Sequence, residues 1–269
     1  MPSNSRQLTV VVPTYAEQEN IRPLTERLFK ACKAENLIVD LLFMDDDSGE
    51  GTRLSEEIVK ELQKTYPVRI YVRRKGSGEG KGLSSAVVLG FEKAKYECIM
   101  CMDADLQHEP EAVPSVAAPV LNGSAEFTVG SRNVAGGGIG MDWALHRRIL
   151  SSGATMLAWP VASSTDPMSG FFCTTRTVFN RGKKVGLNAT GFKIGLELMA
   201  RSAASPVVDV PITFRERVAG ESKLSMSQNI DYVLQLMALY WARYKVLMVL
   251  IILIGLYVLK TIAEYAGLI

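Results

Sequence analysis

The sequence predicts an α/β protein with a mostly parallel sheet flanked by helices and one transmembrane helix at its C-terminal end. In the first half, short runs rich in β-branched residues alternate with helical stretches, a pattern typical of parallel strands joined by right-handed crossovers. Near the other end, residues 246–259 form an unbroken apolar run. The composition, with 48% hydrophobic and 22% charged residues, excludes a disordered or collagen-like chain.

Each element of the first half is assigned from its local pattern. Strands are expected at Leu8–Val12, Val39–Met44, Val68–Val72 and Cys98–Met102. Helices are expected at Glu17–Ala34, Arg53–Thr65 and Leu83–Lys95. Open parallel sheets bind their ligands at the carboxyl ends of the strands. The residues that follow each strand are therefore the candidates for a functional site.

Charge and cysteine usage exclude several classes of protein. The 30 basic and 28 acidic residues give a formal net charge of +2, which is too balanced for a protein that mainly binds nucleic acid. The 4 cysteines are too few and too scattered for a disulfide scaffold. Cys98 and Cys101 lie three apart on an expected strand, so their side chains point to opposite faces and we interpret both as core residues.

The glycine pattern excludes two nucleotide-binding motifs. No G-x-G-x-x-G turn follows the first strand, and residues Gly76–Gly82 do not have the spacing of a P-loop. A Rossmann dinucleotide site and a Walker-type ATPase are therefore excluded. We interpret the glycine cluster as a flexible loop ahead of the third helix rather than as a direct phosphate contact.

Acidic residues follow the second and fourth strands. Residues Asp45–Asp47 come after the second strand, and Asp103, Asp105 and Gln107 come after the fourth. Two acidic clusters at one sheet edge repel each other unless a cation lies between them, which favours a divalent metal that carries a diphosphate. The period of two places Asp103 and Asp105 on the same side, and their hard oxygen atoms suit Mg²⁺ or Mn²⁺, with Gln107 as a neutral donor. His108 is expected to line the loop after this motif.

The C-terminal apolar run is interpreted as a membrane anchor. The run spans about 21 Å as a helix, and its continuation to Ile269 gives about 36 Å, enough for a hydrocarbon core of about 30 Å. Tyr240, Trp241 and Tyr244 precede it, as an interfacial aromatic belt would. The alternative is a buried core helix. We expect a globular domain at 1–225, an amphipathic juxtamembrane segment at 226–245 and the anchor at 246–269.

Residues 141–162 form a second amphipathic stretch. They combine two tryptophans with arginines and aliphatic residues, a composition that suits either a lid helix or a segment in the membrane interface. We favour the interface, because tryptophan and arginine suit headgroup depth. Within this stretch Arg147 and Ser151 are four residues apart and share one helical face.

An ordered set of motifs gives the chain a resemblance. It comprises Val12–Ile21, Asp45–Thr52, Asp103–Pro110, Gly130–Arg132, Asp166–Phe172, Gly191–Lys193 with Glu197, and Arg217 followed by Gly220–Leu224. The set resembles glycosyltransferase family 2, and within it the enzymes that move mannose from GDP-mannose to dolichyl phosphate. One departure is Gly49-Glu50, where the family usually has proline and aspartate; it leaves the role of Glu50 open.

The resemblance implies a GT-A fold, transfer with inversion, and roles for individual residues. The implied donor-binding positions are Pro13, Tyr15, Glu17, Met44, Asp46, Asp103, Ala104, Asp105, Arg132, Arg217 and Lys223. The implied metal ligands for Mg²⁺ or Mn²⁺ are Asp103, Asp105 and Gln107; the acceptor-phosphate residues are Arg132, Arg147 and Ser151; the catalytic residues are Asp105, Arg132 and Arg147. The resemblance also implies an endoplasmic reticulum membrane protein that faces the cytosol and has no obligatory protein partner.

The implied acceptor simplifies the chemistry. A phosphate monoester is already anionic near neutral pH and attacks directly, so no dedicated general base is expected. Two alternatives stay open: a dolichyl-phosphate glucosyltransferase that uses UDP-glucose, and an inactive, membrane-tethered nucleotide-sugar binding protein.

Overall fold

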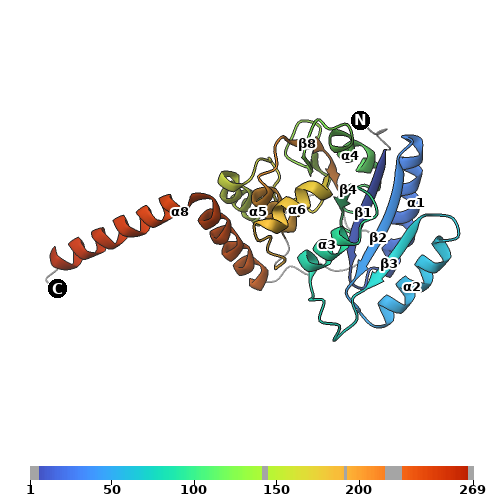
Figure 1. Ribbon diagram of the computed structural model, residues 1–269, viewed down its shortest axis with the longest axis horizontal. Coiled ribbons are helices and arrows are strands. Elements are labelled where there is room, and N and C mark those ends of the chain that lie inside the picture. Colours follow the sequence, from blue (N-terminus) through green and yellow to red (C-terminus); the bar gives the residue numbers. More distant parts are fainter. Residues whose placement is uncertain (1–5, 141–144, 191–192, 216–225, 266–269) are drawn as a thin grey trace.

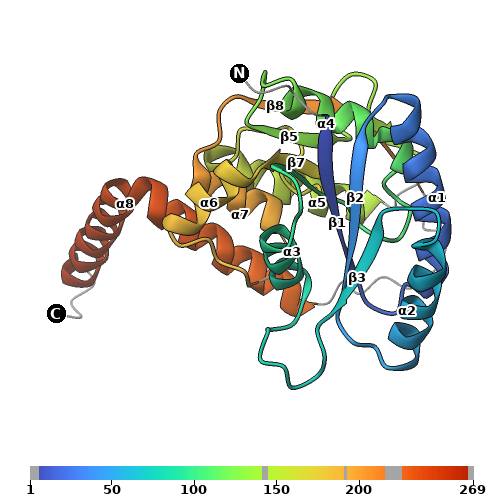
Figure 2. The ribbon, with the colours of Figure 1, turned by 45° about the vertical axis from the view of Figure 1, so that its right-hand side comes forward.

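A seven-stranded sheet forms the centre of the molecule, in the order β3-β2-β1-β4-β7-β5-β8 (Figure 2). The computed structural model describes residues 6–140, 145–190, 193–215 and 226–265. The strands are β1 (Gln7–Thr14), β2 (Ile38–Asp45), β3 (Val68–Val72), β4 (Cys98–Cys101), β5 (Phe127–Ser131), β7 (Phe172–Thr175) and β8 (Val207–Pro211). Neighbouring strands are parallel, except that β7 runs antiparallel to both β4 and β5.

Helices cover both faces of this sheet, which explains why β1 and β2 are apolar almost throughout. One face packs on α1 (Gln18–Ala34), α2 (Glu50–Leu62) and α4 (Val113–Leu121), with η1 (Pro110–Ala112) ahead of α4. The other face packs on α3 (Leu83–Glu92), α6 (Arg176–Lys184) and α7 (Ile194–Ser202). Helix α3 lies so close that a Cβ at Gly90 would be 2.4 Å from Cγ1 of Val11.

The expected strands and helices of the first half are confirmed, with shifts at their ends. Strand β1 continues to Thr14, two residues past the expected end. Helix α2 begins at Glu50 and not at Arg53, because Gly49, with a φ of 79°, turns the chain directly into the helix. The expected opposition of Cys98 and Cys101 is also confirmed, since they pack into the clusters on opposite faces of the sheet.

Smaller elements follow the sheet. Strands β6 (Gly138–Ile139) and β9 (Thr213–Phe214) form a two-stranded pair. Helix α5 (Leu145–Ala158) runs into η2 (Trp159–Val161). A third apolar cluster joins α5 and η2 to α7 and to the long C-terminal helix.

The C-terminal helix α8 (Met226–Tyr265) has a docked part and an exposed part. The backbone departs from helical geometry at Tyr244, and beyond this kink the helix projects away from the domain (Figure 1). Residues Ile230–Ile262 are long and apolar enough to span a membrane, and their 18-residue window with a mean hydropathy of 2.3 is 0% buried. The alternative of a buried core helix is therefore wrong for the described residues, and α8 is a candidate membrane span.

Candidate functional site

One edge of the sheet brings the sequence motifs together. The parallel strands β1, β2, β4 and β5 all end at this edge, and the chain enters β7 from the same edge because β7 is antiparallel to β4 and β5. The loop before β7 therefore meets the loop after β4. The approach is close, since a Cβ at Gly170 would be 2.8 Å from Oδ2 and 2.9 Å from Oδ1 of Asp103.

The loop after β4 carries the expected acidic pair. Asp105 and Gln107 are buried, and the backbone N–H of Gln107 donates to Oδ1 of Asp105 at 3.1 Å. Leu106 takes a positive φ of 61° and packs into the core, as Ala104 does. The two apolar residues thus anchor the loop, and the polar residues on either side of them remain for the site.

His108 lies where it was expected, in the loop after this pair. It is buried between the rings of Phe171 and Phe214, with both ring centroids 5.3 Å away, and its Nδ1 is 3.5 Å from Oδ2 of Asp103. Burial lowers the pKa of His108 to about 4, although Asp105 opposes this shift. His108 is therefore neutral at physiological pH.

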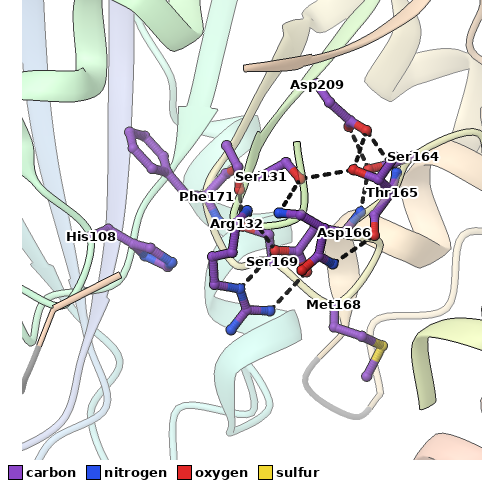
Figure 3. Close-up of polar contacts among 12 residues, drawn as sticks. His108, Ser131, Arg132, Ser164, Thr165, Asp166, Met168, Ser169, Phe171 and Asp209 are labelled. Atoms are coloured by element: carbon purple, nitrogen blue, oxygen red, sulfur yellow. Dashed lines mark hydrogen bonds and ion pairs between the residues drawn. The ribbon is translucent and has the colours of Figure 1, made fainter. Parts of the chain in front are cut away.

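A buried carboxylate fixes the guanidinium of Arg132 at the end of β5 (Figure 3). Nε of Arg132 donates to Oδ2 of Asp166 at 2.7 Å, and Nη2 donates to Oδ1 at 2.8 Å. The backbone N–H of Arg132 also donates to Oδ2 at 3.1 Å, and Asp166 is 0% exposed. A bidentate pair of this kind fixes both the position and the plane of the guanidinium.

A second set of hydrogen bonds supports the loop that carries Asp166 (Figure 3). Asp209 of β8 accepts from the hydroxyl of Ser164 at 2.6 Å and from the hydroxyl of Thr165 at 2.7 Å. Oγ of Ser131 lies 2.9 Å from Oγ1 of Thr165. The loop before β7 is thus tied to both β5 and β8.

Lys193 brings a second cation to the same region. Its ammonium donates to the carbonyl of Met168 at 3.0 Å. Burial lowers the pKa of Lys193 to about 8; Asp103 raises this pKa, and Arg132 lowers it further. The three charged groups thus interact at one place, although they come from three separate segments.

The acidic residues after β2 have a different cation. Arg73, which is 2% exposed, forms an ion pair with Asp46 and also donates to the carbonyl of Gly82 at 2.9 Å. Oδ2 of Asp46 accepts from the N–H of Gly82 at 2.8 Å. Asp45 is fully buried, and this burial raises its pKa. The end of β2 is therefore bound to the start of α3.

The acidic residues after β2 have a cation of their own, and whether a metal also lies between the two clusters stays a prediction. Strand β1 lies between β2 and β4 in the sheet, and Arg73 compensates the charge of Asp46. In the parts of the chain that the structure describes, no three His, Cys, Asp or Glu side chains gather closely enough to hold a metal ion. A metal bound after β4 would take its protein carboxylates from Asp103 and Asp105.

The other expected donor-binding residues lie along the same edge. Tyr15 is 48% exposed just beyond β1, and Oε2 of Glu17 accepts from Nδ2 of Asn20 at 2.7 Å. Pro13 is in β1, whereas Met44 of β2 is fully buried in the core. Met44 also pairs with β1 on one side and β3 on the other, so none of it is exposed, and its role in donor binding stays a prediction.

Four expected site residues cannot be placed in this geometry. Arg217 and Lys223 lie outside the described residues. Arg147 and Ser151 belong to the described backbone of α5, but their side chains lie outside what the structure describes. Their roles stay predictions.

Three residues of the site received no role from the sequence. Asp166 and Lys193 stood inside recognised motifs, but their partners come from distant segments, and spacing alone gives no sign of such pairs. Arg73 directly follows β3, so its position after a strand could have marked it.

Comparisons with known proteins agree with this arrangement. The model of glycosyl transferase family 2 matches residues 9–186. A Mycosarcoma maydis protein named dolichol-phosphate mannosyltransferase is 43% identical over 264 residues, which cover 96% of this chain and 87% of the relative. A Saccharomyces cerevisiae protein of the same name is 42% identical over 242 residues, 88% of each chain.

A solved structure has the same fold. Glucosyl-3-phosphoglycerate synthase from Mycobacterium tuberculosis, in complex with Mn²⁺, UDP-glucose and glycerol 3-phosphate, superposes with a TM-score of 0.56 at 16% identity, covering 88% of this chain and 80% of that chain. The expected GT-A fold, a mostly parallel sheet flanked by helices, is confirmed.

Proposed function

The chain belongs to glycosyl transferase family 2, and we propose that this glycosyltransferase moves mannose from GDP-mannose to dolichyl phosphate with inversion. One observation carries the proposal: acidic and basic side chains gather at a single sheet edge, in a domain joined to a candidate membrane span. The carboxylates are those of Asp103 and Asp166, and the cations are Arg132 and Lys193. The names of the two similar proteins support transfer of mannose and dolichyl phosphate as the acceptor.

The residues after β4 fit a divalent metal. They offer oxygen atoms from Asp103, Asp105 and Gln107, which are the hard donors that Mg²⁺ and Mn²⁺ prefer. Gly170 lets the loop before β7 approach the Asp103 carboxylate more closely than a residue with a Cβ could. A metal with few protein ligands keeps positions for phosphate oxygens. When bound, it would supply positive charge to the diphosphate of the leaving GDP.

The donor nucleoside is assigned to the β1 and β2 side of the edge. Asp46 is held there by Arg73 and by the N–H of Gly82, so its carboxylate is fixed before any ligand binds. Tyr15 offers an exposed ring. Pro13, Glu17 and Met44 complete the proposed set on this side, and Arg217 and Lys223 are proposed to contact the phosphates.

The acceptor phosphate is assigned to Arg132, Arg147 and Ser151. As a phosphate monoester it is anionic near neutral pH, so it attacks the anomeric carbon without a general base. One direct displacement inverts the configuration at that carbon. Asp166 holds the guanidinium of Arg132 in one plane, and this orientation suits two phosphate oxygens.

Exposed apolar side chains near the end of α5 support the proposed contact with the membrane. Met156, Leu157 and Trp159, at the end of α5 and in η2, are 61%, 52% and 57% exposed. These side chains suit an interfacial segment, so a dolichyl chain can stay in the bilayer while its phosphate reaches the domain. We place the protein in the endoplasmic reticulum membrane, with the domain toward the cytosol.

A direct transfer assay tests this proposal. The full-length protein is incubated with dolichyl phosphate and either GDP-mannose or UDP-glucose, and the lipid-linked sugar is measured. We expect mannolipid only, with loss of transfer in EDTA, recovery with Mg²⁺ or Mn²⁺, and an inverted anomeric signal by NMR. Glucolipid alone would overturn the donor, and donor binding without transfer would indicate an inactive binding protein.

A further inference from the structure

The first part of α8 packs against the helices next to the site. Tyr232, Gln235, Leu236 and Leu239 are buried, and their spacing places them on one face of the helix. The apolar members pack with residues of α5, η2 and α7. The part of α8 beyond Tyr244 is exposed, so the helix links the exposed, apolar part of the candidate membrane span to α7.

Gln235 is the polar member of this buried face. It is 7% exposed, and its Nε2 donates to the carbonyl of Lys193 at 3.2 Å and to Oε2 of Glu197 at 3.1 Å. Oε1 of Glu197 accepts from Nε of Arg201 at 3.0 Å. An amide inside an apolar cluster costs desolvation unless it is hydrogen-bonded, and here both bonds go to the first turn of α7.

Lys193 stands at the junction between this contact and the sheet edge. It directly precedes α7, and its carbonyl accepts from the N–H of Glu197 at 3.1 Å as well as from Gln235. Its side chain runs the other way, to the carbonyl of Met168, where the ammonium interacts with Asp103 and Arg132. The backbone of Lys193 therefore faces α8 while its charge belongs to the site.

We propose that Gln235 is a positioning residue that acts through Lys193, so that the helix that leads to the membrane also sets the charge arrangement of the catalytic centre. The inference rests on the proposed function. By fixing the carbonyl of Lys193, Gln235 fixes the start of α7 and hence the place of the ammonium at the carbonyl of Met168, in the loop that carries Asp166. The donor and acceptor of a glycosyl transfer must be aligned closely, and misplacement of about 1 Å can cost about 10²-fold in rate.

A double-mutant cycle on the full-length protein tests this role. Gln235→Met removes both hydrogen bonds and keeps an unbranched side chain of similar length. With GDP-mannose and dolichyl phosphate, we expect kcat to fall about tenfold while the KM for GDP-mannose changes less than about twofold. Leu239→Met, on the same buried face, is the matched control and should keep wild-type kcat.

The second arm of the cycle distinguishes positioning from general destabilisation. Lys193→Met should lower kcat, and adding Gln235→Met should lower it no further, because Gln235 acts through Lys193. Losses that multiply in the double variant, or a Gln235→Met variant with normal kcat, would overturn the inference. If Gln235→Met does not fold, Gln235→Asn, which shortens the reach of the amide, takes its place in the cycle.

Failure of the inference can be told apart from failure of the proposed function. Wild-type mannolipid formation decides the function, and the ratios between variants decide the role of Gln235. If the wild-type protein uses only UDP-glucose, the donor assignment fails, and the same cycle run with that donor still decides the inference.

Discussion

The proposed donor side of the sheet edge, around Asp46, is built from neighbouring segments, whereas the proposed acceptor side, around Arg132, is built from distant ones. Asp46 and Arg73 follow β2 and β3, which pair directly in the sheet. Arg132 after β5 instead takes its partner from the loop before β7, and Lys193 comes from the chain ahead of α7. The ion pair of Asp46 with Arg73 therefore forms within one βαβ unit.

This difference indicates which parts of the chain each side depends on. The donor side is closed by contacts among β1, β2, β3 and α3, none of which involves α8. The acceptor side is connected to α8 through Gln235 and to β8 through Asp209. Changes near the membrane should therefore alter acceptor use and turnover, and should leave donor binding unchanged.

The largest expected effect is the fall in kcat when Asp105, between the two sides, is replaced. Asp105→Ala removes a proposed metal ligand and not a core side chain, so the fold should persist while kcat falls about 10²–10³-fold. Steady-state transfer and circular dichroism measure the two quantities. Glu35→Gln, an exposed acid at the end of α1, is the control. Near-normal transfer by Asp105→Ala in saturating Mn²⁺ would show that the metal assignment is wrong.

The second prediction compares one substitution on each side, Asp166→Asn and Asp46→Asn, by their effects on kcat and KM. Asp166→Asn weakens the bidentate hold on Arg132, so kcat should fall about 10²-fold with little change in the KM for GDP-mannose. The free energy of unfolding should fall by about 3 kcal/mol, because a buried pair loses one charge. Asp46→Asn is the counterpart on the donor side and should mainly raise the KM for GDP-mannose. The same kinetic pattern in both variants would contradict the division.

The acceptor phosphate gives the third prediction. If Arg147 binds this phosphate, Arg147→Ala should raise the KM for dolichyl phosphate about tenfold, the loss expected for one charged hydrogen bond. Arg147→Lys restores the charge without the planar fork and should rescue in part. Titration of GDP-mannose without acceptor should give wild-type affinity, and a large loss there would move Arg147 to the donor side.

The contrast between the sides also explains what the sequence could predict. The strands and helices of the donor side were recognisable because each is coded by a local pattern, such as the apolar run of β1 or the acids that directly follow a strand. The shifted start of α2 depends on Gly49, whose positive φ is visible only in the structure.

The acceptor side was less predictable for a physical reason. The pairing of Asp166 with Arg132 depends on β7 running antiparallel between β4 and β5, which no local pattern encodes. The ion pair of Asp46 with Arg73 was not predictable for the same reason, since it depends on the strand order and on the position of Arg73. Gln235 looked like an ordinary residue of an amphipathic helix.

The smallest expected effect tests whether donor binding is independent of the membrane. A chain that ends at Lys245 keeps Gln235 and the buried face of α8 but lacks the exposed part of the helix beyond the kink at Tyr244. It should leave the membrane fraction while its affinity for GDP-mannose, measured by calorimetry, changes less than about twofold, because no contact of Asp46 or Arg73 is removed.

A chain that ends at Ser225 is the matched comparison. It also loses the cluster with α5 and α7, so it should unfold at a lower temperature. If the chain ending at Lys245 stays on membranes after a high-salt wash, residues 141–162 are the stronger anchor. If it loses donor affinity, the two sides are coupled through α8, and the division drawn here is wrong.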